Sequence, residues 1–324
     1  MKKFTIALLS CLVAIGIALF LVGLGMAGWN FKNLNEGGPF EVKSVDTQET
    51  VENIYIDAKD AEIVLKPSED GKFKAEYQEN KRYLYDVKLS DGEFRLTDIT
   101  RRKWYHYLFS FNFTTPRIVL YLNAQQLENV SLSTRNAGIR SESTLEALRF
   151  TAETSNAGIT LCNLASQTTI SLSSSNGKIT AENLSAVEGI NIGPSNGKII
   201  LRSVRSETVD AHTSNGAVSA ESVTAENIRF KTTNESVSAL SVSADSLYME
   251  TSNAHISADK IDGKNIQMYT SNSRVSASIR GRREDFLISS RTSNASNNLG
   301  STDSGSWRLI VKTSNGNIDV GFLG

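Results

Sequence analysis

From about residue 130 onward, hydrophobic and polar positions alternate in a fixed relation to a recurring Thr-Ser-Asn element. With each asparagine taken as position zero, position −6 is apolar in all ten copies and position −4 in nine. Position +3 is Ile or Val in nine copies, and position −2 is Thr or Ser in nine. Because side chains alternate between the two faces of a strand, this period of two predicts short strands with positions −6, −4 and −2 on one face. The ten asparagines are Asn136, Asn156, Asn176, Asn196, Asn215, Asn234, Asn253, Asn272, Asn294 and Asn315.

Successive asparagines are spaced almost evenly, 19 to 22 residues apart. A fixed period of this length predicts a solenoid, and the lack of a helical half-repeat argues against leucine-rich repeats. We therefore expect an all-β, single-stranded parallel β-solenoid (β-helix) of about ten coils of 19–22 residues. Stacked coils lie ~4.8 Å apart, so the asparagines should form an interior ladder of side-chain amides beside a row of threonines.

The residues at position +6 support this register. The first eight copies place there Glu142, Cys162, Glu182, Arg202, Glu221, Leu240, Asp259 and Ser278. Acidic residues never occupy neighbouring copies, and Arg202 stands between Glu182 and Glu221. Like charges on adjacent strands repel, so a stacked column requires an order of this kind.

A degenerate copy of the repeat precedes the regular ones, with Asp60 at the position of the asparagine. An insertion from Pro67 to Pro116 follows it and contains hairpin-like segments, which we expect to cap the exposed strand edges at this end of the solenoid. The sequence thus divides into a transmembrane signal anchor (1–30), a linker (31–48), a first coil with a β-hairpin cap (49–125) and the β-solenoid repeats (126–324).

The N-terminal segment is apolar, with no charged residue from Phe4 to Trp29 and with Lys2 and Lys3 before it. A stretch of this length can cross a ~30 Å hydrocarbon core as a helix. We expect a single-pass anchor in the cell membrane, with the lysines inside and residues 31–324 extracytoplasmic. A signal peptide cleaved after Gly25-Met26-Ala27 is the alternative, although its apolar region would be unusually long. A lipoprotein box at Cys11 is disfavoured because the apolar run continues beyond it.

Composition narrows the chemistry. The 34 basic and 35 acidic residues balance, so no global field would attract nucleic acid. Two cysteines and three histidines leave little material for a disulfide framework or a metal site. No nucleophile elbow, phosphate loop or zinc-protease motif is present in the sequence. We therefore expect no catalytic residues, no cofactor and no metal.

One segment combines cations with aromatic rings, namely 101–113 in the predicted cap insertion. Such a combination can stack on sugars, bind anionic polymers or rest at a membrane interface. The possible binding patch is Arg101, Arg102, Lys103, Trp104 and His106. The competing interpretation is a hairpin whose alternating aromatic side chains simply pack onto the cap.

The repeated Thr-Ser-Asn-Gly-x-Ile element, seen again at 313–318, and the N-terminal anchor resemble a bacterial putative-adhesin β-strand-repeat family of unknown function. The resemblance covers roughly residues 50–324 and implies a surface or envelope role without supplying catalytic residues. We expect a non-enzymatic envelope scaffold or adhesin-like protein whose partners are the membrane and a cell-wall polymer, a carbohydrate or another envelope protein. A carbohydrate-active β-helix enzyme and an envelope-stress accessory protein with a membrane partner are the alternatives.

Overall fold

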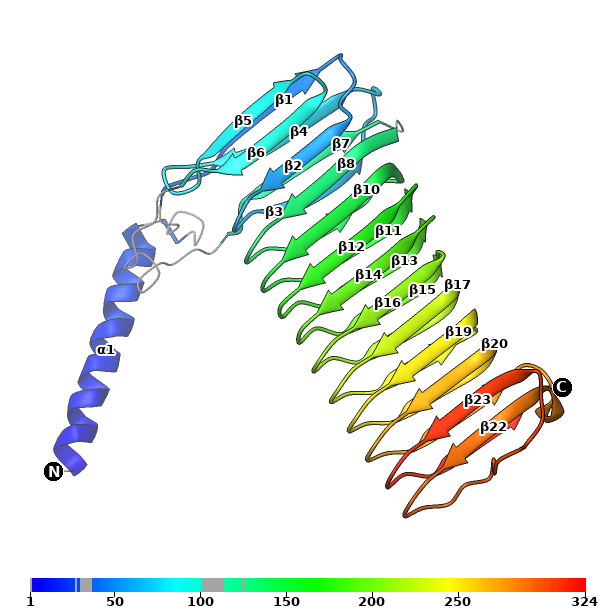
Figure 1. Ribbon diagram of the computed structural model, residues 1–324. Coiled ribbons are helices and arrows are strands. Elements are labelled where there is room, and N and C mark those ends of the chain that lie inside the picture. Colours follow the sequence, from blue (N-terminus) through cyan, green and yellow to red (C-terminus); the bar gives the residue numbers. More distant parts are fainter. Residues whose placement is uncertain (1, 27, 30–36, 101–113, 124–125) are drawn as a thin grey trace.

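The structure is a computed structural model that describes residues 2–26, 28–29, 37–100, 114–123 and 126–324. Helix α1 (Lys2–Met26) precedes a body built almost entirely of strands (Figure 1). The strands of the N-terminal part are β1 (Glu41–Thr47), β2 (Asn53–Asp57), β3 (Glu62–Pro67), β4 (Phe73–Glu79), β5 (Tyr85–Ser90), β6 (Glu93–Asp98) and β7 (Arg117–Leu122).

Strands β8 to β21 form the regular solenoid, in which each strand pairs in parallel with its equivalent in the next coil (Figure 1). Ile170 of β12 lies opposite Phe150 of β10 and Ile190 of β14, so the predicted repeat positions are in register. The parallel β-solenoid is therefore confirmed. The remaining strands of this part are β8 (Gln126–Ser133), β9 (Ile139–Ser141), β10 (Leu145–Thr154), β11 (Ile159–Ser166), β13 (Ile179–Ala186), β15 (Ile199–Arg205), β16 (Thr208–His212), β17 (Val218–Lys231), β18 (Val237–Leu240), β19 (Ser243–Glu250), β20 (Ile256–Tyr269) and β21 (Val275–Ile279), while β12 and β14 span Thr169–Ser174 and Gly189–Pro194.

Each regular coil bends at the asparagine and bends again seven residues later. At position +7 six consecutive coils hold a non-glycine residue with φ between 52° and 56°. Five of the six are Asn or Ser, which are short side chains, and asparagine in particular tolerates the left-handed region. This second bend was not predicted from the sequence. The six residues are Asn163, Asn183, Ser203, Ser222, Ser241 and Lys260.

The core runs the length of the stack as rows of equivalent side chains. Positions −6, −4, +3 and +8 point inward, and Phe150, Phe230, Leu184 and Ile199 are at most 1% exposed. Burying one such side chain contributes about 1.5–3 kcal/mol, so the repetition of the rows stabilises the whole stack.

At the N-terminal end, the first coil lies inside the stack. Strand β2 pairs in parallel with both β6 and β8, and β3 pairs with both β7 and β9. Strands β5 and β6 form an antiparallel hairpin, and β4 pairs antiparallel with β1 and β7. Strand β1 lies in the segment 31–48 that we predicted as a linker, so that prediction is wrong for residues 41–47. Of its two apolar residues, Val42 is exposed and only Val45 packs against the core, which explains the weak signal.

The C-terminal end has the same arrangement in reverse. The last strands are β22 (Phe286–Arg291), β23 (Trp307–Lys312) and β24 (Ile318–Phe322), with a 3₁₀ turn η3 at Arg283–Asp285. Strand β23 pairs with both β20 and β22, so β22 is the outermost rung although it comes earlier in the chain (Figure 1). The spatial order of the rungs therefore departs from the sequence order at this end.

Candidate functional site

The binding patch predicted from the sequence cannot be placed. Arg101, Arg102, Lys103, Trp104 and His106 lie within 101–113, outside the described residues. It stays a prediction, and the candidate surfaces below belong to the solenoid itself.

The asparagines form one continuous ladder of side-chain hydrogen bonds. Each Nδ2 donates to the Oδ1 of the asparagine on a neighbouring rung over 2.5 to 3.0 Å. Asn136 donates in turn to Asp60, which occupies the first rung. Asn315 lies between Asn272 and Asn294, in keeping with the position of β23 between β20 and β22.

The ladder lies on the surface, contrary to the expectation of an interior one, because all ten asparagine residues are exposed at the bend. The buried polar row is instead the threonine and serine row at position −2. Thr232, for example, is 1% exposed, and its hydroxyl donates to the Gly216 carbonyl of the neighbouring rung over 2.7 Å. Thr251 and Thr270 do the same to the carbonyls of Glu235 and Ala254 over 2.8 and 2.9 Å. These hydroxyls satisfy carbonyl groups that the bend leaves out of the strand ladder.

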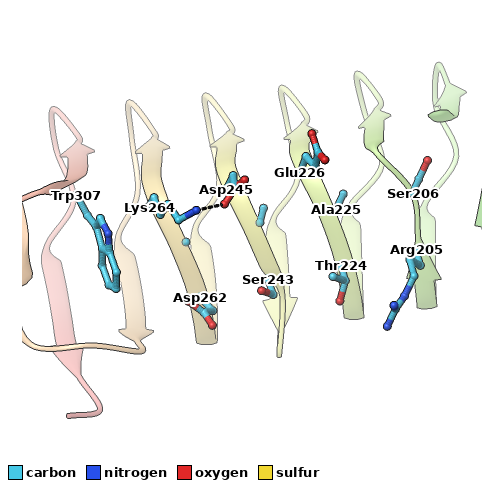
Figure 2. A pocket seen from close by; sticks show the side chains of 12 residues that line it. Arg205, Ser206, Thr224, Ala225, Glu226, Ser243, Asp245, Asp262, Lys264 and Trp307 are labelled. Carbon is cyan, nitrogen blue, oxygen red and sulfur yellow. Dashed lines mark hydrogen bonds and ion pairs between the residues drawn. The ribbon is translucent and has the colours of Figure 1, made fainter. Parts of the chain in front are cut away.

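A shallow groove of about 450 Å³ runs across successive coils along positions +9 to +11 of the repeat (Figure 2). Small residues form its floor because every rung has one at the same position: Ser206, Ala225, Ala244 and Gly263. One rim carries Arg205, Thr224, Ser243 and Asp262, and the other carries Glu226, Asp245 and Lys264.

Trp307 closes the groove at its C-terminal end (Figure 2). Its ring packs edge-on against Phe286 at 5.3 Å. Lys264 neutralises Asp245 across one rung at 2.7 Å, and both side chains are more than 60% exposed. The groove therefore has hydrogen-bonding side chains along its rims and small residues along its floor. None of its carboxylates is buried in a way that would tune its pKa for acid–base catalysis.

A second cluster of polar and aromatic side chains lies on the outer face of the strand segments that precede each asparagine. Here Tyr248 and Tyr269 pack ring to ring at 5.6 Å. The Tyr248 hydroxyl donates to Glu250 over 2.6 Å, and Lys231 pairs with the same carboxylate at 2.9 Å. Burial, followed by the bond to Glu250, raises the pKa of Tyr248 to about 12. For Glu250, desolvation opposes ionisation, but the bonds from Tyr248 and Lys231 outweigh it and lower its pKa.

This tyrosine pair was not predicted from the sequence, where only segment 101–113 was singled out for its aromatic rings. The signal was present, because Tyr248 is at position −5 of its coil and Tyr269 at position −3 of the next. Both positions face outward, and rungs lie only ~4.8 Å apart, so the two rings had to be neighbours.

Adjacent to Tyr269 is a cavity of about 340 Å³ at the C-terminal rungs. Its charged lining consists of Glu250, Lys312 and Arg291, and a row of serines borders it. Lys312 lies between Tyr269 and Arg291, each of which is opposite it on an adjacent strand.

In the part of the chain that the structure describes, no group of three His, Cys, Asp or Glu residues is arranged to hold a metal. The column at position +6 has the predicted register, with Arg202 opposite both Glu182 and Glu221. Cys162 lies in that column, its sulfur 3.1 Å from the Ser141 carbonyl, and burial raises the pKa of the thiol. A raised pKa makes the thiolate, the reactive form, scarce at neutral pH.

Comparison with known proteins finds a matching family model and several similar solved structures. The family model described as Toastrack DUF4097 matches residues 51–318. Two similar solved structures are described as putative adhesins, from Parabacteroides distasonis and Parabacteroides merdae; each is 12% identical, with a TM-score of 0.47. The first match covers 89% of this chain and 99% of the other, and the second covers 90% and 98%.

A third structure, described as a putative lipid binding protein from Parabacteroides distasonis, is 12% identical with a TM-score of 0.36, covering 90% of this chain and 99% of the other. No curated protein matches the chain significantly. The family match spans most of the chain and coincides with the solenoid and its N-terminal cap. The chain therefore belongs to the Toastrack DUF4097 family.

Proposed function

We propose that the chain is a non-enzymatic surface protein of the cell envelope. In this proposal α1 anchors it in the cell membrane, and residues 31–324 form an extracytoplasmic arm that binds an envelope component. The observation that supports anchoring is the exposure of an apolar helix. Thr5–Met26 is long and apolar enough to cross a membrane, and its side chains such as Leu12, Val13 and Leu19 are more than half exposed. Apolar surface on this scale calls for a hydrocarbon environment.

The solenoid supports a binding role rather than a catalytic one. Its hydrogen-bonded rungs make a stiff wall on which outward side chains repeat at the rung spacing, which suits an extended partner. The carboxylates in the groove are exposed or ion-paired, as with Asp245 and Lys264, and offer no isolated acid–base pair.

Topology is tested with protease added to intact spheroplasts. We expect residues 31–324 to be digested, and the intact chain to remain with membranes after a high-salt wash, because Lys2 and Lys3 favour the cytoplasmic side. Full protection from protease would contradict the proposed orientation. Release of a shortened chain into the medium would show that the N-terminal segment is a cleaved signal sequence.

A matched pair of variants tests the anchor itself. Leu12→Arg with Ile15→Arg places two charges in the middle of α1, at a cost of roughly 2.5–3.5 kcal/mol each. We expect this variant to lose membrane retention. Val42→Arg alters an equally exposed apolar residue outside the helix and should leave retention unchanged. Incubating the full chain with wall polysaccharide should release no reducing sugar, and release would favour the enzyme alternative.

A further inference from the structure

The cavity at the C-terminal rungs combines features that no repeat of the solenoid needs for folding. Position −3 places Glu250, Tyr269, Lys312 and Arg291 on four neighbouring rungs in that order. All four side chains point outward and line the cavity of about 340 Å³. Serines at position −1 of the same rungs border it, namely Ser252, Ser271, Ser314 and Ser293.

The cavity has an excess of positive charge. Lys312 and Arg291 lie directly opposite each other on adjacent strands, an arrangement that is destabilising for like charges. Two other cations on this face are neutralised, since Arg229 pairs with Asp210 at 3.3 Å and Lys231 with Glu250 at 2.9 Å. Among the described residues, Lys312 and Arg291 form no ion pair, and the only carboxylate of the cavity, Glu250, is already engaged by Lys231 and Tyr248.

Tyr269 adds an aromatic surface next to these cations. Its ring is held by Tyr248 at 5.6 Å, and its hydroxyl donates to Gln267 over 3.0 Å. A fixed ring of this kind can pack against the apolar face of a sugar, while neighbouring hydroxyl groups bond to the sugar's own. The two cations beside it supply charge-assisted hydrogen bonds to an anionic substituent.

We propose that this cavity binds an acidic glycan, a sugar polymer that carries carboxylate or phosphate groups. Lys312 and Arg291 would hold the anionic group, Tyr269 the sugar ring and the serine row the sugar hydroxyls. The proposal rests on the proposed function, since it names the class of envelope component that the extracytoplasmic arm binds.

A polymer is favoured over a lipid headgroup by the position of the cavity. Nine hydrogen-bonded steps of the asparagine ladder separate Asp60 from Asn315. At about 4.8 Å a step, the cavity lies roughly 43 Å along the stack from the rung of Asp60, which belongs to the first coil after α1. The site is thus at the end of the arm remote from the segment that follows the anchor.

The test uses the full chain in nanodiscs of neutral lipid, titrated with polygalacturonate and, separately, with a phosphomannan. Dextran serves as the neutral glycan, and vesicles containing phosphatidylglycerol serve as the lipid source of phosphate. The variant is Arg291→Gln with Lys312→Gln. Its matched control is Lys178→Gln with Lys198→Gln, which removes the same charge from two neighbouring rungs on another side of the solenoid.

We expect Arg291→Gln with Lys312→Gln to weaken binding of an acidic glycan about tenfold or more, as loss of charge-assisted hydrogen bonds implies. The control pair should bind normally, dextran should not bind, and Arg291→Lys should retain most of the affinity. Tyr269→Leu should weaken binding of the glycan while leaving any binding of inorganic polyphosphate unchanged.

Native affinity in the Gln pair, or equal losses in both pairs, would overturn the proposal. Vesicle binding that depends on Lys312 and Arg291, without binding of either glycan, would replace the glycan with a lipid headgroup. These outcomes are independent of topology, because they are measured on purified protein, and so they are distinguishable from a failure of the proposed function.

Discussion

At the scale of single residues, the repeat motif separates two roles that its sequence presents side by side. The asparagine at position zero is exposed and links rungs along the surface, whereas the threonine at position −2 is buried and satisfies a carbonyl inside the bend. Gly177 follows one of the asparagines, and a side chain there would clash with the Ala157 carbonyl oxygen of the neighbouring rung. Stability should therefore depend more on the threonine than on the more conspicuous asparagine.

This difference is measurable on one rung. Thr232→Val keeps the side-chain shape but removes the donor to Gly216, and leaving a buried acceptor unpaired costs about 1–3 kcal/mol. Asn234→Ala opens two amide bonds that water can replace, so the cost should stay below about 1 kcal/mol. Denaturant midpoints of the two variants, with exposed Lys198→Ala as the control, give the comparison. A larger loss for Asn234 would mean that the amide ladder, rather than the buried hydroxyl row, holds the rungs together.

A second residue-scale prediction concerns Tyr248. Its pKa is raised from 10.0 to about 12 in the folded chain, first by burial and then by the bond to Glu250. The neutral phenol is favoured by folding, so its contribution is complete below pH 10 and is lost as the pH rises toward 12. Tyrosinate absorbance should show a late-titrating group that is missing in Tyr248→Phe. The variant should also lose less stability than the native chain between those pH values; equal losses would contradict the assignment.

At the scale of elements, periodicity could be read from the sequence, but the order of the outermost rungs could not. Each coil repeats the same inward positions, so register, strand direction and the place of Asp60 follow from local pattern alone. Strands β2 and β23 each lie between two other strands, because a later or earlier segment of the chain pairs with their outer edge. Equivalent rungs offer nearly identical edges, so the sequence pattern does not show which edge such a segment will choose. Strand β1 escaped prediction because it pairs at an edge and buries little, and the bend at position +7 because Asn and Ser also suit ordinary turns.

The sandwiched C-terminal strand leads to an element-scale prediction. Strand β23 has a strand on both sides, whereas the free edge of β22 is covered by loop hydroxyls: Thr302 and Ser301 accept from the amides of Ile288 and Ser290 over 2.8 and 3.3 Å. Hydrogen exchange measured by mass spectrometry should therefore be slower in 308–312 than in 286–290, against the usual fraying toward a chain end. Thr302→Val should speed exchange at Ile288 without affecting β23. Faster exchange in β23 would refute this order of rungs.

At the scale of the whole molecule, a solenoid keeps distant surfaces independent, because each rung contacts only its neighbours. The candidate surfaces of this chain are far apart in the sequence. The segment 101–113, with its predicted patch, belongs to the insertion in the N-terminal part of the sequence, and the cavity of Lys312 and Arg291 belongs to the last rungs. Under the proposed function, two such surfaces would let the chain bind two partners independently.

Independence of the two surfaces is the last prediction. Replacing Arg101, Arg102, Lys103 and Trp104 with Ser should weaken binding to anionic lipid or wall polymer with little change in thermal stability, because it removes three cations and an aromatic ring. Combined with Arg291→Gln and Lys312→Gln, each surface should lose as much affinity for its own ligand as in the single variant, since distant sites that share no partner do not couple. Titration of the four-residue variant, the two-residue variant and their combination provides the measurement, with circular dichroism as the folding control. Unfolding of the four-residue variant would instead favour a purely structural role for this segment in the cap, and unchanged binding would remove it as a site.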